Sequence, residues 1–248
     1  MTKKSFAARW GYRLSLLAAV IALLGILGFR FDVMPFRMAL SGLAGGALVA
    51  SAAAALSIIG LAVTASGRRA GRGIAIVGLV MGLLIAVPVF YYRHLGTTVP
   101  PIHDISTDLT DPPQFIVMAR DRPPGLNTLD RTSPPDLAAR QQAAYPEIKT
   151  LALPMPPDQL FDRAAATAHN MGWDIVLADK STGHLEAIDT TPVMGFKDDI
   201  VIRLRPEAPY TLVDIRSVSR VGESDLGTNA RRIRHFLALL RESDRSSD

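Results

Sequence analysis

The sequence contains no cysteine, and its first 94 residues contain a single acidic residue, Asp32. The lack of cysteine excludes disulfides, zinc–thiolate sites and thiol nucleophiles. The lack of acidic residues is local: residues 1–94 hold ten Lys and Arg against one acid, a net charge of +9, whereas residues 95–248 hold 17 against 22, a net charge of −5. The overall charge of +4 therefore belongs to the first part, and it does not indicate a nucleic-acid-binding protein.

Charge of either sign is also missing from three long apolar stretches, at residues 14–29, 38–67 and 73–92. With help from flanking arginines, each is long enough to cross a bilayer as a helix, which takes about 20 residues. We therefore predict a membrane anchor of three transmembrane helices over residues 1–94. Because no charged residue lies inside a span, we expect no ion or proton path. A cleaved signal peptide is the alternative for the first stretch, although no clear small-residue cleavage site follows it.

Basic residues beside the apolar stretches predict how the anchor is oriented. Seven lie before the first stretch or between the second and third: Lys3, Lys4, Arg9, Arg13, Arg68, Arg69 and Arg72. Three lie on the other side: Arg30, Arg37 and Arg93. Because basic loops stay in the cytoplasm, we expect a cytoplasmic N-terminus and a C-terminal domain outside the cytoplasm, which is the periplasm if the membrane is a bacterial inner membrane. The expected partner of the anchor is the lipid bilayer.

The second apolar stretch is rich in small residues between positions 41 and 56. Small side chains allow helices to approach each other closely in lipid. We expect these residues to pack the three helices of one chain against each other, with a dimerisation surface as the alternative.

Proline is concentrated in one segment: twelve of the 17 prolines lie between positions 100 and 157, several of them in consecutive pairs. Consecutive prolines favour extended geometry and interrupt helices. The segment also carries apolar residues such as Ile102 and Phe115, which need burial. We therefore predict that residues 95–149 form an extended arm that packs on the domain that follows.

One cluster in this arm has the residue types of a metal site: His103 with Asp104, Asp108 and Asp111. Aspartates interleaved with Ser and Thr, as in DISTDLTD, more often form turns and helix caps. These residues are therefore weak candidates for metal ligands, and we expect no metal and no other cofactor.

Regular periodicity begins at residue 150 and predicts a soluble domain over residues 150–248. A proline-led amphipathic segment at 156–172 predicts a helix, and short apolar runs bounded by turn residues predict strands. The predicted strands cover residues 150–153, 173–178, 184–190, 199–205 and 211–218, and a last helix covers 227–241. The order β-α-β(4)-α predicts a two-layer α+β fold, with an antiparallel sheet and both helices on one face.

Alternation along the strands assigns their residues to two faces of this sheet. The apolar face, expected to contact the helices, holds Trp173, Ile175, Leu177, Ile200, Ile202, Leu204, Val213 and Ile215. The opposite face holds Glu186, Arg203, Arg205, Asp214 and Arg216. Because opposite charges on adjacent strands form cross-strand pairs, we predict a ladder of ion pairs on an exposed face of the sheet.

The last helix carries four basic residues and one amide that stands apart from them. Helical geometry places Arg231, Arg232, Arg234 and His235 opposite or beside the apolar stripe, so we expect them on a solvated surface. Asn229 instead falls on the apolar face in the first turn, where a buried amide must be hydrogen-bonded.

Two interpretations of the residues around Asn229 stay open. Arg216 or Arg220 can bond to Asp225 and Asn229 and lock strand to helix, and Asp198 or its neighbour can receive an arginine from the same turn. Arginines near a helix N-terminus can instead bind a phosphate or carboxylate. The candidate binding residues are Arg216, Arg220, Asp225, Asn229 and Asp198, and no catalytic residue is assigned.

Five segments after Pro100 together carry a resemblance to a known family. They are PPIHDISTDLTDPPQF at 100–115, AYPEI at 144–148, MGWDIV at 171–176, GFKDDIVIRLR at 195–205 and DIRSVSRVGESDLGTNARRIRHFLALL at 214–240. In these segments the chain resembles an uncharacterised bacterial family, the domain of unknown function 1499. The resemblance implies that the arm and the domain form one unit and that membrane segments precede them. It implies no activity, because the family has none established.

Motifs of familiar chemistries are missing from the sequence. It has no Gly-x-Ser-x-Gly, no phosphate-binding glycine loop followed by Lys, and no His-Glu-x-x-His. We therefore expect a non-catalytic binding or interaction domain, whose partner is an envelope protein or an anionic small molecule. One alternative is a hydrolase or transferase that uses His103 or His184 with nearby acids, and another is a lipid- or anionic-ligand-binding domain.

Overall fold

The structure is a computed structural model that describes residues 3–65, 67, 69–120 and 122–245. The chain divides into a helical unit, within residues 1–97, and a domain formed by residues 98–192 and 196–248. Arg68, one of the basic residues that predict the orientation of the anchor, lies outside the described residues.

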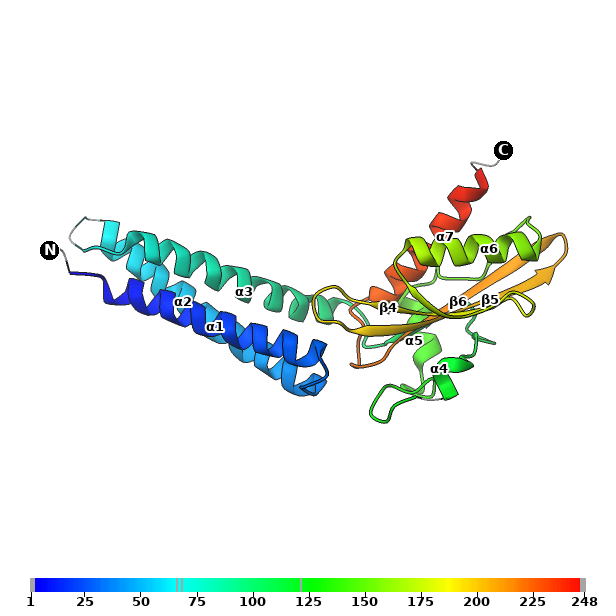
Figure 1. Ribbon diagram of the computed structural model, residues 1–248, viewed down its shortest axis with the longest axis horizontal. Coiled ribbons are helices and arrows are strands. Elements are labelled where there is room, and N and C mark those ends of the chain that lie inside the picture. The colour runs from blue at the N-terminus through cyan, green and yellow to red at the C-terminus, as the bar shows by residue number, and fades with distance from the viewer. Residues whose placement is uncertain (1–2, 66, 68, 121, 246–248) are drawn as a thin grey trace. The chain divides into compact units, whose positions relative to one another are not determined.

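Three helices make up the helical unit (Figure 1): α1 (Phe6–Arg30), α2 (Phe36–Ala65) and α3 (Arg72–Thr98). All three have the length and apolar composition that crossing a membrane requires. The prediction of three such helices is confirmed, and each begins before its apolar stretch. At the start of α1, the Oγ of Ser5 accepts the N–H of Ala8 and caps the helix.

Glycine and serine let these helices pack closely, because larger side chains would not fit. A Cβ atom on Gly11 of α1 or on Gly78 of α3 would lie 2.3 or 2.6 Å from the Oγ of Ser57 in α2. The small residues of α2 thus pack against helices of their own chain, as small residues do in membrane bundles. Bulky side chains such as Leu24 and Leu84 are exposed, on the surface that lipid would cover.

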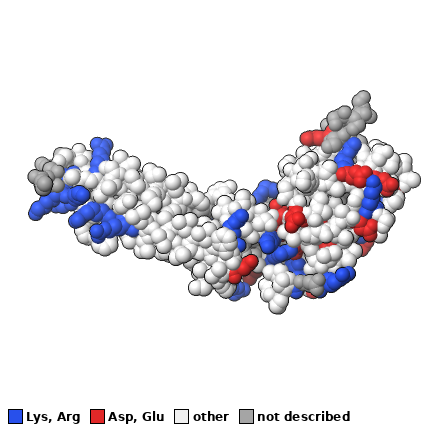
Figure 2. Space-filling view, in the orientation of Figure 1, with Lys and Arg blue, Asp and Glu red and all other residues white. Residues whose placement is uncertain are grey.

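Charge is unevenly distributed over the helical unit. Figure 2 shows Lys and Arg gathered at the end that holds the N-terminus, while the lengths of the helices carry little charge. An anchor has this distribution when its apolar length lies in lipid and its basic end lies in water.

The domain is built on one antiparallel sheet in the order β1-β6-β5-β4-β3, with β2 also paired to β6. The strands are β1 (Asp104–Ser106), β2 (Leu151–Leu153), β3 (Asp174–Asp179), β4 (His184–Thr190), β5 (Lys197–Glu207) and β6 (Tyr210–Ser219). The helices are α4 (Val117–Arg120), α5 (Leu137–Ala144), α6 (Pro157–Asn170) and α7 (Thr228–Arg245). The predicted α+β fold with an antiparallel sheet is confirmed.

Helices α6 and α7 form where apolar residues recur every three or four positions. The buried residues are Leu160, Phe161, Ala164 and Ala168 in α6, and Ala230, Ile233, Phe236, Leu237 and Leu240 in α7. Helix α6 begins at Pro157, whose fixed φ suits a first helical position, and Asp158 lies in its positively polarised first turn.

These two helices cover one face of the sheet and complete the main core (Figure 1). Trp173 stacks on Phe236 of α7, with ring centroids 5.4 Å apart. Six residues predicted for this face are buried: Trp173, Ile200, Ile202, Leu204, Val213 and Ile215. Ile175 and Leu177 are only partly buried, because they lie in the edge strand β3 at a register shift against β4.

The opposite face of the sheet is covered by the proline-rich arm. Phe115 and Met118 of the arm pack against Val201 and Val218 of the sheet in a second, smaller core. The arm is extended at strand β1, and it also forms two short helices, α4 and α5, which the sequence did not predict. The two short helices occupy stretches between the proline pairs, where no proline interrupts the backbone hydrogen bonds.

The predicted exposure of the charged sheet face is wrong. Glu186, Asp214 and Arg216 are each 0 % exposed, because the arm lies over them. Alternation assigned these side chains to the correct face, but a strand pattern contains no information about which segment will cover that face.

Candidate functional site

The amide of Asn229 lies at the centre of a buried polar cluster at the start of α7. Its Oδ1 accepts hydrogen bonds from Ser217 Oγ (2.6 Å) and from the Arg232 guanidinium (2.5 Å). Its Nδ2 donates to the carbonyl of His103 (3.0 Å) and to Ser219 Oγ (3.0 Å). The expectation of a hydrogen-bonded amide is confirmed, and the amide links α7 to β6 and to the arm.

Arg232 is the arginine of this cluster, and the prediction that it lies on a solvated surface is wrong, since it is 6 % exposed. Its Nε donates to Asp189 (2.8 Å), and its Nη2 donates to Asp198 (2.6 Å). These two aspartates are directly opposed on β4 and β5, where like charges repel. Arg232 can therefore be buried because it flanks the apolar stripe of α7 and its charge offsets the repulsion between these two carboxylates.

Asp225 organises the turn that precedes α7. Its carboxylate accepts the N–H groups of Gly227 and Asn229, each at 2.8 Å. Burial raises the pKa of the Asp225 carboxyl above its usual value, and the two N–H bonds only partly oppose that rise. The side chain acts as a local cap of the helix start.

Arg216 and Arg220 do not join the cluster, so the predicted bonds from these arginines to Asp225 and Asn229 are wrong. Arg216 is bidentate to Asp104, at 3.1 and 2.7 Å, and also donates to the carbonyls of Pro113 and Leu129. Arg220 donates to Asp199 at 2.8 Å. Of the five predicted binding residues, the structure thus brings together Asp198 and Asn229 through Arg232, and Asp225 through the backbone N–H of Asn229.

The residues considered as metal ligands have other partners. Asp104 pairs with Arg216 and Arg131, and Asp108 pairs with Arg203 and Arg205. The ring of His103 lies 3.4 Å from the carbonyl oxygen of Glu223. Over the described ranges, no group of three or more His, Asp or Glu side chains has the geometry of a metal site.

His184 forms a buried pair with Glu186, at 3.0 Å. The same carboxylate accepts the backbone N–H groups of Ile116, Val117 and Met118 at the start of α4. Burial acts to raise the pKa of Glu186, but the bonds from His184 and the three N–H groups outweigh it and lower the pKa below its usual value. This pair fastens the arm to the sheet, and sequence reasoning missed it because the donors are backbone groups far away in the chain.

A surface pocket of about 320 Å³ lies beside α7 within the domain. Its lining consists of Met171, Trp173, Asp189, Thr228, Arg231, Arg232 and His235. Arg231 and His235 are exposed, as predicted. Sequence reasoning did not find this pocket, because it assigned Trp173 to the core and the basic residues to the surface, and the pocket lies where the two meet.

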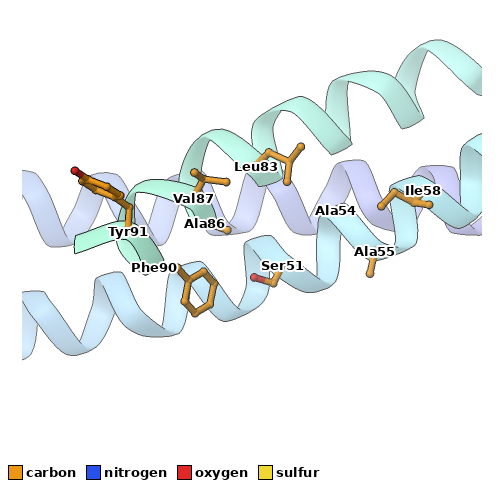
Figure 3. A pocket seen from close by; sticks show the side chains of 9 residues that line it. All are labelled: Ser51, Ala54, Ala55, Ile58, Leu83, Ala86, Val87, Phe90 and Tyr91. Carbon is orange, nitrogen blue, oxygen red and sulfur yellow. The ribbon is translucent and has the colours of Figure 1, made fainter. Parts of the chain in front are cut away.

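The helical unit has a groove of its own, of about 580 Å³, between α2 and α3 (Figure 3). Its lining is aliphatic and aromatic apart from Ser51, whose hydroxyl donates to the carbonyl of Ala47, and Tyr91. Such a surface is what membrane helices present to lipid chains, and it adds no charged or catalytic group to the site.

A sequence profile described as a protein of unknown function (DUF1499) matches residues 104–240, which is more than half of the 248-residue chain. The chain belongs to the DUF1499 family. The match begins at β1 and ends within α7, so the DUF1499 domain includes most of the arm, the cluster around Asn229 and the pocket beside α7. A search of curated proteins found no match to the chain.

Proposed function

We propose that this DUF1499 protein is a membrane-anchored binding protein that holds its domain outside the cytoplasm, in the periplasm of a bacterial cell. Three apolar helices support the anchor. Seven basic residues against three support a cytoplasmic N-terminus, and an odd number of spans then carries the domain across the membrane.

The pocket beside α7 carries the binding part of this proposal. It combines two apolar side chains, Met171 and Trp173, with the exposed cation Arg231. Pockets that bind small molecules typically join an apolar lining to a few placed polar groups. The buried ion pairs of the domain, by contrast, fasten the arm and α7 to the sheet. We therefore assign the domain to ligand or partner binding without chemical conversion.

Reporter fusions test the orientation in intact cells. Alkaline phosphatase joined after Asp248 should be active, because the enzyme folds only outside the cytoplasm, and green fluorescent protein joined there should be dark. The matched control joins the same reporters after Gly71, between α2 and α3, and should give the opposite result. An active phosphatase after Gly71 together with an inactive one after Asp248 would show that the orientation is wrong.

Binding is tested on the full chain after extraction in a mild detergent. Native mass spectrometry should then show a small molecule or an envelope protein bound to the chain. Recovery of only the bare monomer, which also fails to bind any component of a membrane or envelope extract, would rule out the binding assignment.

A further inference from the structure

Two arginines line the pocket beside α7, and they differ in their partners. Arg232 donates to Asp189, Asp198, Ser217 and Asn229. Its positive charge is shared between the carboxylates of Asp189 and Asp198, so it is not free to bind a ligand. Arg231 is the lining arginine that can bind one.

Arg231 is held in place by neutral acceptors. Its two Nη atoms donate to the carbonyl of Leu226 (3.1 Å) and to Thr228 Oγ1 (3.0 Å). Among the described residues, no carboxylate lies within ion-pair distance of this guanidinium. A guanidinium has five N–H donors, so three remain for a ligand in an orientation that the two existing bonds fix.

Two of the residues that line the pocket are apolar. Met171, at the end of α6, is partly buried, and the indole of Trp173 stacks on the ring of Phe236. A volume of about 320 Å³ is at the lower end of the range for small-molecule pockets. The space therefore suits a compact ligand rather than a peptide or a nucleotide.

We propose that this pocket binds a small oxyanion, a phosphate or a carboxylate, that carries a compact apolar group. Arg231 binds the anionic end, and Met171 and Trp173 contact the apolar end. The proposal rests on the proposed binding function and names its ligand class. Two sources supply this chemistry next to a membrane: a soluble phosphate or carboxylate compound, and the headgroup of an anionic phospholipid.

The two tryptophans of the chain provide the assay. Labelling tryptophan with ¹⁵N in the full chain gives two indole N–H signals, Trp173 at the pocket and Trp10 in α1 as an internal reference. A Trp10→Phe variant assigns them. In nanodiscs of zwitterionic lipid, phenyl phosphate and benzoate should shift the Trp173 signal in a saturable way and leave Trp10 unchanged. Inorganic phosphate should bind more weakly, and uncharged benzyl alcohol should not bind.

Substitutions identify the anion-binding residue. Arg231→Gln should raise the Kd for phenyl phosphate about tenfold or more, because charge-assisted hydrogen bonds are lost. Arg241→Gln, the same change on an exposed arginine of the same helix, should leave the Kd unchanged. Met171→Glu tests the site without altering the start of α7, and the added negative charge should also raise the Kd about tenfold.

The two sources give different results in the same assay. If headgroups are the ligand, nanodiscs that contain phosphatidylglycerol should already show the shifted Trp173 signal, and phenyl phosphate should compete. If the ligand is soluble, both kinds of nanodisc should give the same titration. The proposal is overturned if no probe moves Trp173, if benzyl alcohol moves it equally, or if Arg231→Gln titrates like the wild type. Such a failure would not affect the reporter result on orientation. The proposal of an oxyanion ligand and the proposal of a domain outside the cytoplasm can therefore be rejected independently.

Discussion

The two faces of the sheet are buried by different chemistry. Helices α6 and α7 cover one face with aliphatic and aromatic side chains, whereas the arm covers the other with ion pairs and a small apolar patch. On the apolar face, removal from water is itself the driving force. On the charged face, desolvation costs free energy that the pairing must offset, so such a face adds little net stability.

The comparison shows that the charged face is the more fragile of the two. A methyl group lost from the apolar face leaves a small cavity, whereas one partner lost from the charged face leaves a buried charge alone. Stability measurements on the full chain in detergent can separate these cases, with Trp173 fluorescence in a Trp10→Phe background as the probe.

The largest effect is expected for Asp104→Ala, which leaves the fully buried Arg216 without its carboxylate. The free energy of unfolding should fall by about 3–5 kcal/mol. Asp111→Ala is the matched control in the same arm, because Asp111 is exposed and its pair with Arg203 should contribute less than about 1 kcal/mol. Equal losses from the two variants would contradict the contrast drawn between buried and exposed pairs. Urea unfolding curves provide the measurement.

Glu186→Gln should cost about 1–3 kcal/mol at neutral pH, because the amide accepts fewer of the N–H groups of the arm. The folded-state pKa of Glu186 is lowered, so the wild-type advantage is full above the usual pKa of 4.5 and is lost as the pH falls through the folded value. Unfolding at a series of pH values should show the difference between wild type and variant shrinking in acid. A difference that grows in acid would mean that the carboxylate is not the stabilised form.

Asp225→Ala should show the opposite pH trend. The folded-state pKa of Asp225 is raised, so its contribution is full below the usual pKa of 3.8 and declines as the pH rises through the folded value. We expect a cost of about 0.5–2 kcal/mol in acid, as for other caps, that becomes smaller towards neutral pH. The same series of unfolding curves measures this loss of stability. A loss that increases with pH would contradict the raised pKa of Asp225.

The smallest effect is expected for Ile202→Val on the apolar face, where one methyl group is removed from the main core. The loss should be about 0.5–1.5 kcal/mol. Val176→Ala, on the exposed side of the edge strand β3, should change stability by less than about 0.5 kcal/mol. If Ile202→Val cost as much as Asp104→Ala, the two faces would not differ in fragility.

Residue patterns within a single helix or strand correctly predicted several features of the fold. Apolar stretches located the three long helices, and strand alternation located Ile200, Ile202, Val213 and Ile215 in the core. The need of Asn229 for hydrogen bonds followed from its place on the apolar stripe of α7. Each of these predictions depends only on the period of a helix or strand and on the cost of burying a polar group.

Partners that are distant in the chain were not predictable in the same way. The sequence shows that Arg216, Arg220 and Arg232 lie near one turn. The carboxylate with which each arginine pairs depends on the strand register and on the path of the arm. Arg232 differs from Arg231 by one position in the helix, but it is buried and pairs with Asp189 and Asp198, which the helix period does not predict. The pocket beside α7 was missed for the same reason.

Strand β1 and the carboxylate of Asp104 mean that a shortened protein beginning at Thr150 would not be a smaller version of this domain. It would leave Arg216 without a counterion, Glu186 without three donors, and the edge of β6 that pairs with β1 exposed. Anyone who excises the DUF1499 domain for crystallisation should cut ahead of Pro100 and keep the whole arm.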